Sequence, residues 1–85
     1  MAYRVRLDPH VQSQLRDAPP QLQGFVAGII AFLRTDPTSA TAAFPVIAGE
    51  DFRTIVFANG RGFLDYQVFE DRQLVVIDEL TWLGD

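Results

Sequence analysis

The chain has 85 residues, of which 48% are hydrophobic and 21% are charged, the composition of a globular domain and not of a disordered chain. The chain has seven arginines, no lysine and eleven acidic residues, so its formal net charge is −4 and its pI is near 4.7. This acidic balance argues against direct nucleic-acid binding. Cysteine is absent, which excludes a disulfide framework and a thiolate zinc site.

This length predicts a single domain over residues 1–85. The opening residues lack the apolar run of a secretory signal, and no segment approaches the ~18 apolar residues of a membrane span. We therefore expect a cytoplasmic protein without membrane contact. We find no cofactor or metal motif, so neither is expected.

The first elements are a strand and a short helix. Tyr3–Leu7 alternates apolar and polar residues, the period of a strand with one buried face. Asp8 and Pro9 then form a typical helix start, an acceptor side chain followed by a proline whose fixed φ suits the first turn. The helix is expected from His10 to about Asp17.

A second, longer helix is predicted over Pro20–Arg34, where apolar residues recur at three- and four-residue spacing. It should cover the core. Gly24 and Gly28 lie four residues apart in it, either as a site where a neighbour packs closely or as tolerated weak points, and we favour close packing by the first helix.

The rest of the chain predicts strands. Asn59-Gly60 is a strong hairpin signal, and Glu70 to Gln73 is a second polar turn. Gly49 to Asp51 belong to a further turn that starts at Ala48. The segments expected as strands are Phe44–Ile47, Phe52–Ala58, Gly62–Phe69 and Leu74–Leu80.

The fold class predicted is α+β, in the order β-α-α-β-β-β(-β), with a helical hairpin packed on one face of a small, mostly antiparallel twisted sheet. The other face is left uncovered, and we call it the open face. Strand alternation over residues 62–69 assigns Leu64, Tyr66 and Val68 to the core, and it assigns Phe63, Asp65, Gln67 and Phe69 to the open face.

Several phrases occur in an order that resembles the RelE/ParE toxin superfamily of bacterial type II toxin–antitoxin systems. They are YRV, a helix opened by DP, an amphipathic helix ending in FLRTDP, a strand RTIV, then GRGFLDYQV and a VVID strand. The resemblance covers about Tyr3 to Leu80. It implies a small α+β toxin that is neutralised by a cognate antitoxin, whose extended or helical tail wraps over it.

Two activities follow from this resemblance. ParE-like members bind DNA gyrase, whereas RelE-like members are ribosome-dependent mRNA interferases, endoribonucleases that drive a 2′-hydroxyl onto the adjacent phosphate. Such cleavage needs a base, cations for the phosphate and an acid for the leaving oxygen. For the RelE-like alternative, the catalytic residues implied are Arg53, Arg61 and Tyr66, although the family's arginine at the start of the phrase that ends in this tyrosine falls on Phe63 here.

Each of these residues also has a structural interpretation. Arg61 can be a turn residue, Arg53 can pair with Glu50, Asp51 or Asp65, and Tyr66 can belong to the core. Trp82 can be a partner anchor or can close the sheet edge against the first helix. The lone histidine, His10, is interpreted as an exposed helix residue, and the adjacent Asp78 and Glu79 as pointing to opposite faces.

The C-terminal strand ends in acids where nuclease members carry bases, and the open face mixes apolar and acidic residues. Such a surface suits a protein partner better than RNA. The sequence therefore favours a ParE-like toxin that binds a protein target, with gyrase as a candidate, through Phe63, Asp65, Phe69 and Trp82. Two alternatives remain: the mRNA interferase, and a non-toxic family member serving in partner binding or autoregulation.

Overall fold

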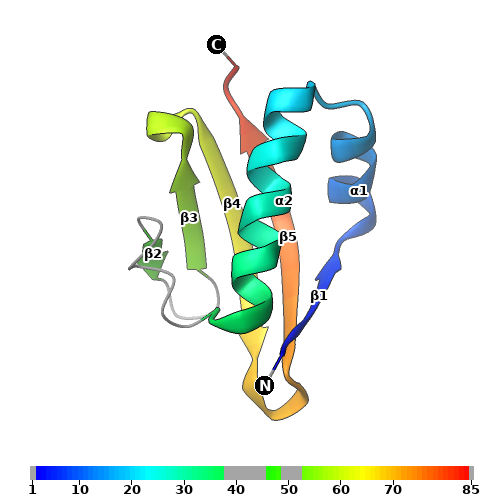
Figure 1. Ribbon diagram of the computed structural model, residues 1–85, viewed down its shortest axis with the longest axis vertical. Coiled ribbons are helices and arrows are strands. Elements are labelled where there is room, and N and C mark those ends of the chain that lie inside the picture. Colours follow the sequence, from blue (N-terminus) through cyan, green and yellow to red (C-terminus); the bar gives the residue numbers. More distant parts are fainter. Residues whose placement is uncertain (1, 38–45, 49–52, 85) are drawn as a thin grey trace.

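The computed structural model describes residues 2–37, 46–48 and 53–84, and its two helices lie side by side on one face of a five-stranded sheet (Figure 1). The elements in chain order are β1 (Arg4–Leu7), α1 (Pro9–Arg16), α2 (Pro20–Thr35), β2 (Val46–Ala48), β3 (Arg53–Phe57), β4 (Gly62–Phe69) and β5 (Leu74–Trp82). The predicted α+β order is confirmed. Phe44 and the turn at Gly49–Asp51 lie outside the described residues.

The sheet has the strand order β1-β5-β4-β3-β2. Strands β2 to β5 pair antiparallel with their neighbours, and β1 pairs parallel with β5. The first strand therefore lies beside the last, with the helical hairpin as the crossover that returns the chain to the sheet.

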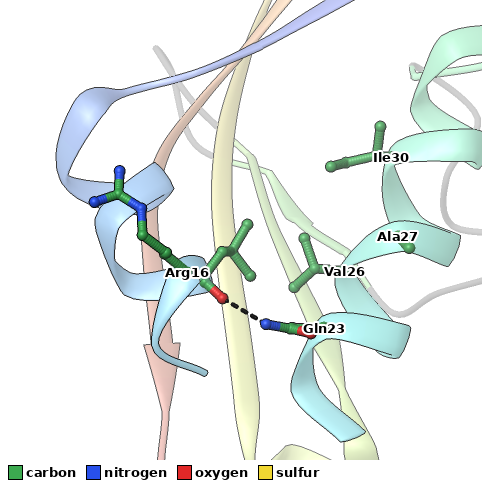
Figure 2. A pocket seen from close by; sticks show the side chains of 6 residues that line it. Arg16, Gln23, Val26, Ala27 and Ile30 are labelled. Carbon is green, nitrogen blue, oxygen red and sulfur yellow. Dashed lines mark hydrogen bonds between the residues drawn. The ribbon is translucent and has the colours of Figure 1, made fainter. Parts of the chain in front are cut away.

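Both helices begin where their sequence signals predict. Asp8 caps α1 by accepting a hydrogen bond from the His10 backbone N–H (3.3 Å), and Pro9 occupies the first turn. Helix α2 begins at Pro20 and ends before Asp36, whose backbone N–H donates to Phe32 O (3.0 Å). Gln23 Nε2 donates to Leu15 O (2.9 Å) and ties the two helices together (Figure 2).

The core lies between α2 and the central strands. Helix α2 buries one side against β3, β4 and β5. The residues that these strands contribute to the core cluster are at most 5% exposed. The alternation predicted for β4 is confirmed, since Leu64 and Tyr66 are buried on the helix side while Phe63 and Asp65 are half-buried on the other. The core cluster comprises Val11, Leu22, Val26, Ile29, Leu33, Ile55, Phe57, Leu64, Tyr66, Val75, Ile77 and Leu80.

A β-bulge interrupts the pairing of β4 with β5. Asp65 lies opposite Glu79 and Tyr66 opposite Ile77, so Asp78 is the extra residue. Ile77 and Leu80 are both buried in the core, and the two acids between them are not. The expectation that Asp78 and Glu79 point to opposite faces is therefore wrong, because the bulge shifts the alternation and turns both from the core.

The glycines of α2 also differ from expectation. A β-carbon added at Gly24 or Gly28 would meet nothing within 4 Å beyond its own chain neighbours and helix backbone. Helix α1 does not pack against them, so the interpretation as a close-packing site for α1 is wrong. Helix α1 is instead tied to α2 by the hydrogen bond from the Gln23 side chain to Leu15 O.

The connection from β3 to β4 is a tight turn with three successive residues in the left-handed region. Ala58, Asn59 and Gly60 have φ values of 54°, 56° and 86°. Asparagine and glycine adopt this region readily, which explains their presence at the predicted hairpin. Among the described residues, no helix is long and apolar enough to cross a membrane.

Candidate functional site

The open face is the side of the sheet that the helices leave uncovered. Strand register places Phe63 and Asp65 of β4 beside Val56 and Thr54 of β3. The Thr54 hydroxyl donates to Asp65 Oδ1 (2.7 Å), which fixes the orientation of that carboxylate. The open face therefore has a defined acidic centre next to apolar side chains.

Three carboxylates gather at this centre because of the β-bulge. Glu79 lies opposite Asp65, and the bulged Asp78 is close enough for the Asp65 and Asp8 charges to act on it. Burial, with these two like charges, raises the pKa of Asp78 above its usual range. The bulge thus concentrates negative charge on the open face, which the sequence alternation alone did not predict.

Apolar contacts and cations occupy the other end of the open face. Phe69, 38% exposed, lies opposite Leu74, which is 8% exposed and lies outside the main core cluster. Arg4 and Arg6 of β1 are exposed and are in register with Leu74 and Val76. The alternation of the first strand predicted that Arg4 and Arg6 lie away from its buried face, but they were not among the candidate site residues.

His10 joins the start of α1 to the acidic centre. Its Nδ1 lies 2.6 Å from Asp8 Oδ1 and its Nε2 lies 3.4 Å from Glu79 Oε2. The hydrogen bond to Asp8 raises the pKa of His10, and both carboxylate charges add to that effect. His10 is exposed, as expected, but it bridges two acids of different elements.

This bridge predicts a pH-dependent stability. A histidine with a raised folded-state pKa contributes stability below its ordinary value of 6.5, and this contribution is lost as the pH rises through the folded-state pKa. We expect the wild-type protein to lose more unfolding free energy than His10→Gln between about pH 5.5 and about pH 8.5. Urea unfolding of both proteins measures the difference, and parallel pH profiles would contradict it.

Arg53 and Tyr66 lie on the helix side of the sheet. They are directly opposite each other in the β3–β4 register, and the Tyr66 hydroxyl donates to Pro37 O (3.0 Å). Burial raises the pKa of Tyr66, and the charge of Arg53 opposes that rise. The expected pairing of Arg53 with Asp65 is wrong, because the two residues are on opposite faces; Glu50 and Asp51 lie outside the described residues.

Arg61 follows the β3–β4 turn and lies over Trp82. Its Nε donates to Ala58 O (3.1 Å), and its guanidinium carbon is 5.8 Å from the centroid of the Trp82 ring. The indole stacks on Phe57 at 6.1 Å and meets Phe25 at 6.3 Å. Trp82 thus closes the end of the core against Phe25 of α2, whereas the structural interpretation placed it against the first helix.

The structure does not bring the two arginines together with each other. Arg53 begins β3, whereas Arg61 lies beyond the turn at its other end. The strand alone separates them by about 13 Å at roughly 3.3 Å per residue. The proposed catalytic set Arg53, Arg61 and Tyr66 remains a prediction, and it does not form one cluster on the open face. Within the described residues, no group of three His, Cys, Asp or Glu side chains is placed to hold a metal ion.

Comparison with known proteins gives matches at the level of structure alone. No protein-family model and no curated protein matches the chain. RelE in the archaeal RelE–RelB complex from Pyrococcus horikoshii OT3 is similar, with a TM-score of 0.76 and 22% identity over 99% of this chain and 98% of that one. The isolated E. coli RelE toxin gives a TM-score of 0.77 and 15% identity over 99% and 87%.

A third similar structure is the Mycobacterium tuberculosis RelBE2 toxin–antitoxin complex, with a TM-score of 0.74 and 19% identity over 96% of this chain and 99% of that one. The likeness in all three extends over nearly the whole chain, as the sequence resemblance implied. At identities this low, it establishes the architecture and not the activity. The chain has the fold of the RelE toxins.

Proposed function

We propose that this protein is the toxin of a type II toxin–antitoxin pair, that it acts by binding a protein target through its open face, and that a cognate antitoxin neutralises it. The fold supports the toxin assignment, because similar structures are toxins solved with the antitoxin RelB. Gyrase, the target that the ParE resemblance implies, is the first candidate. The protein would act in the cytoplasm.

The observation that carries the proposal is the acidic centre of the open face. Asp65, Asp78 and Glu79 gather there, next to Phe63. Three carboxylates repel a phosphodiester, whereas an apolar surface with fixed acids fits a protein segment that carries arginine or lysine. Arg53 and Arg61, the cations that the cleavage mechanism would use, are engaged on the helix side and at the turn.

The mRNA interferase is the second candidate, and two observations favour it. The similar structures are RelE proteins, and exposed Arg4 and Arg6 give one margin of the open face positive charge. Ribosomal RNA could be contacted at that margin. In this alternative the open face would bind the ribosome, and Arg53, Arg61 and Tyr66 would be expected to act on the message.

Induced expression separates the two candidates. We expect growth arrest with intact messenger RNA, together with accumulation of gyrase–DNA breaks. Asp65→Lys should relieve the arrest and weaken target binding about tenfold or more, because it places a cation where the partner's cation would lie. The matched control, Glu70→Lys, makes the same charge change at an exposed turn and should leave the arrest intact.

Codon-specific cuts in messenger RNA that disappear in Arg61→Ala would overturn the binding proposal in favour of the interferase. Absence of growth arrest at good expression of folded protein would instead leave the non-toxic alternative. The genomic neighbourhood gives an independent test, since a toxin of this class is expected beside a short reading frame for its antitoxin.

A further inference from the structure

Strand β1 forms one edge of the sheet. It pairs with β5, and no other described strand pairs with it (Figure 1). The Arg4 N–H donates toward β5, to Gln73 O (2.9 Å). The Asp8 N–H does the same, to Ile77 O (3.0 Å). Because the backbone groups of alternate strand residues point to the same side, the even-numbered positions of β1 bond to β5, and Val5 between them points outward.

The chain itself occupies both ends of this edge and leaves its middle open. Tyr3 N–H donates to Arg34 O (2.7 Å), and Gln12 Nε2 donates to Leu7 O (2.9 Å). Between these two contacts, the Val5 N–H and C=O groups have no hydrogen-bond partner within the described part of the chain. Unpaired N–H and C=O groups on an edge strand are a template for a strand of another chain.

The side chains around this opening differ between the two faces of the sheet. Arg4 and Arg6, on either side of Val5, are exposed on the open face, and neither has an ion-pair partner among the residues that the structure describes. Val5 itself is half-buried on the helix side, where it packs against the core. A segment paired with β1 would therefore meet positive charge on one face and apolar surface on the other.

We propose that this opening, the β1 edge formed by Arg4, Val5 and Arg6, binds an extended segment of a partner protein in which two acidic residues flank an apolar one. In antiparallel pairing, the apolar residue lies opposite Val5 and exchanges both backbone hydrogen bonds with it. Its neighbours lie opposite Arg6 and Arg4, where acids form cross-strand ion pairs. Its own side chain lies on the helix side, beside Val5.

The backbone groups and the charges together select this occupant. A helix has already used its backbone N–H and C=O groups internally, and a nucleic acid has none in strand spacing, so neither satisfies Val5. A second copy paired through its own β1 would set arginines opposite arginines, which is unfavourable. A basic segment is repelled for the same reason. An alternating acidic segment provides the backbone pairing, the opposite charge and the apolar contact at once.

The contact should be weak. The opening is short and its two ion pairs are exposed, so we expect a dissociation constant in the micromolar to millimolar range. This second site goes beyond the proposed binding of a target at the acidic centre. Its affinity is measured with an isolated peptide and without the target, so a failure of the growth-arrest experiment and a failure at the β1 edge are distinguishable.

Calorimetric titration of the purified chain with a short peptide, in which glutamate alternates with valine, tests the proposal. We expect saturable binding, about tenfold or more tighter than for two control peptides. One control has glutamine at every glutamate position, which tests the charge. The other has the same glutamates and valines gathered in two blocks, which tests the alternation. Absence of saturable binding up to about 1 mM, or equal affinity for the three peptides, would overturn the proposal.

N-methylation of the alternating peptide tests the backbone pairing. Methylating the valine amides removes the N–H that would donate to the Val5 carbonyl, so the affinity should fall about tenfold or more. Methylating the glutamate amides instead changes only N–H groups that point away from β1, and the affinity should stay within about twofold. Equal effects of the two methylations contradict the proposal, because a peptide held by its side chains alone has no such parity.

A charge reversal on the protein tests the arginines. Arg6→Glu should weaken binding of the alternating peptide about tenfold, because it sets like charges opposite each other. Arg16→Glu, the same change at an exposed position of α1, is the matched control and should leave the affinity unchanged. Circular dichroism checks that both variants are folded. If Arg6→Glu loses affinity for a short single-stranded RNA and keeps it for the peptide, the arginines belong to a nucleic-acid surface and the proposal is wrong.

Discussion

Gly62→Ala is expected to lower the free energy of unfolding by about 1–3 kcal/mol, although it adds one methyl group. The β-carbon of any residue at this position would overlap the Phe57 ring, at Cε2, Cζ and Cδ2. That ring cannot move freely, since it is stacked on Trp82 and lies 5.5 Å from the ring of Phe25, centroid to centroid. The variant must therefore displace the aromatic cluster that closes the end of the core.

Chemical denaturation followed by circular dichroism measures the loss of stability, and the fluorescence of Trp82, the one tryptophan of the chain, reports the displaced stack. Gly28→Ala is the matched control. It makes the same chemical change in open space within a helix, and it should stabilise the monomer by about 1 kcal/mol. Equal stability of Gly62→Ala and wild type would contradict the ring contact.

The elements could be predicted because their signals are local. The Asp8-Pro9 start, the periodicity of α2 and the alternation of β4 each depend on neighbouring residues, and the Gly62–Phe69 strand was predicted with the bounds it has. The parallel pairing of β1 with β5 was not predicted. This pairing joins residues about seventy positions apart in the sequence. It depends on which edge of the sheet is still available to β1 once the other strands have paired.

The site was predicted less well, because it depends on which face each side chain takes. Arg53 has the parity of Ile55 and Phe57, both buried, so the sequence did contain a signal that it lies on the helix side. The bulge at Asp78 also left a trace, since Leu80 is out of phase with Val75 and Ile77. Alternation alone could not predict that Asp78 lies close to Asp65, because this depends on the register of β4 with β5.

The stretch from Asn59 to Phe69 forms the end of the β3–β4 turn and strand β4. Its two glycines have structural roles. Gly60 adopts a φ of 86° in the turn, and Gly62 leaves room for the Phe57 ring. Its arginine covers the Trp82 indole. What it presents on the open face is Phe63 and Asp65, so the surface that this segment offers to a partner is apolar and acidic.

Tyr66→Ala is expected to destabilise the protein by about 3–5 kcal/mol, the range for removing a large buried aromatic side chain. Tyr66→Phe should cost about 1–3 kcal/mol, because it keeps the ring but leaves the buried Pro37 carbonyl without the hydroxyl that now donates to it. That hydrogen bond ties β4 to the segment just after α2. Denaturation curves of the two variants measure both losses.

The same pair of variants distinguishes a structural Tyr66 from a catalytic one. A catalytic hydroxyl would make Tyr66→Phe inactive while it is still folded, with growth arrest and any messenger RNA cleavage lost together. We expect the opposite, a less stable protein that still arrests growth at temperatures where it is folded. The reason is geometric: the hydroxyl faces the helices, its burial raises its pKa, and the open face is on the other side of the sheet. A proton acceptor for a 2′-hydroxyl must reach the substrate, and Tyr66 is enclosed by the core.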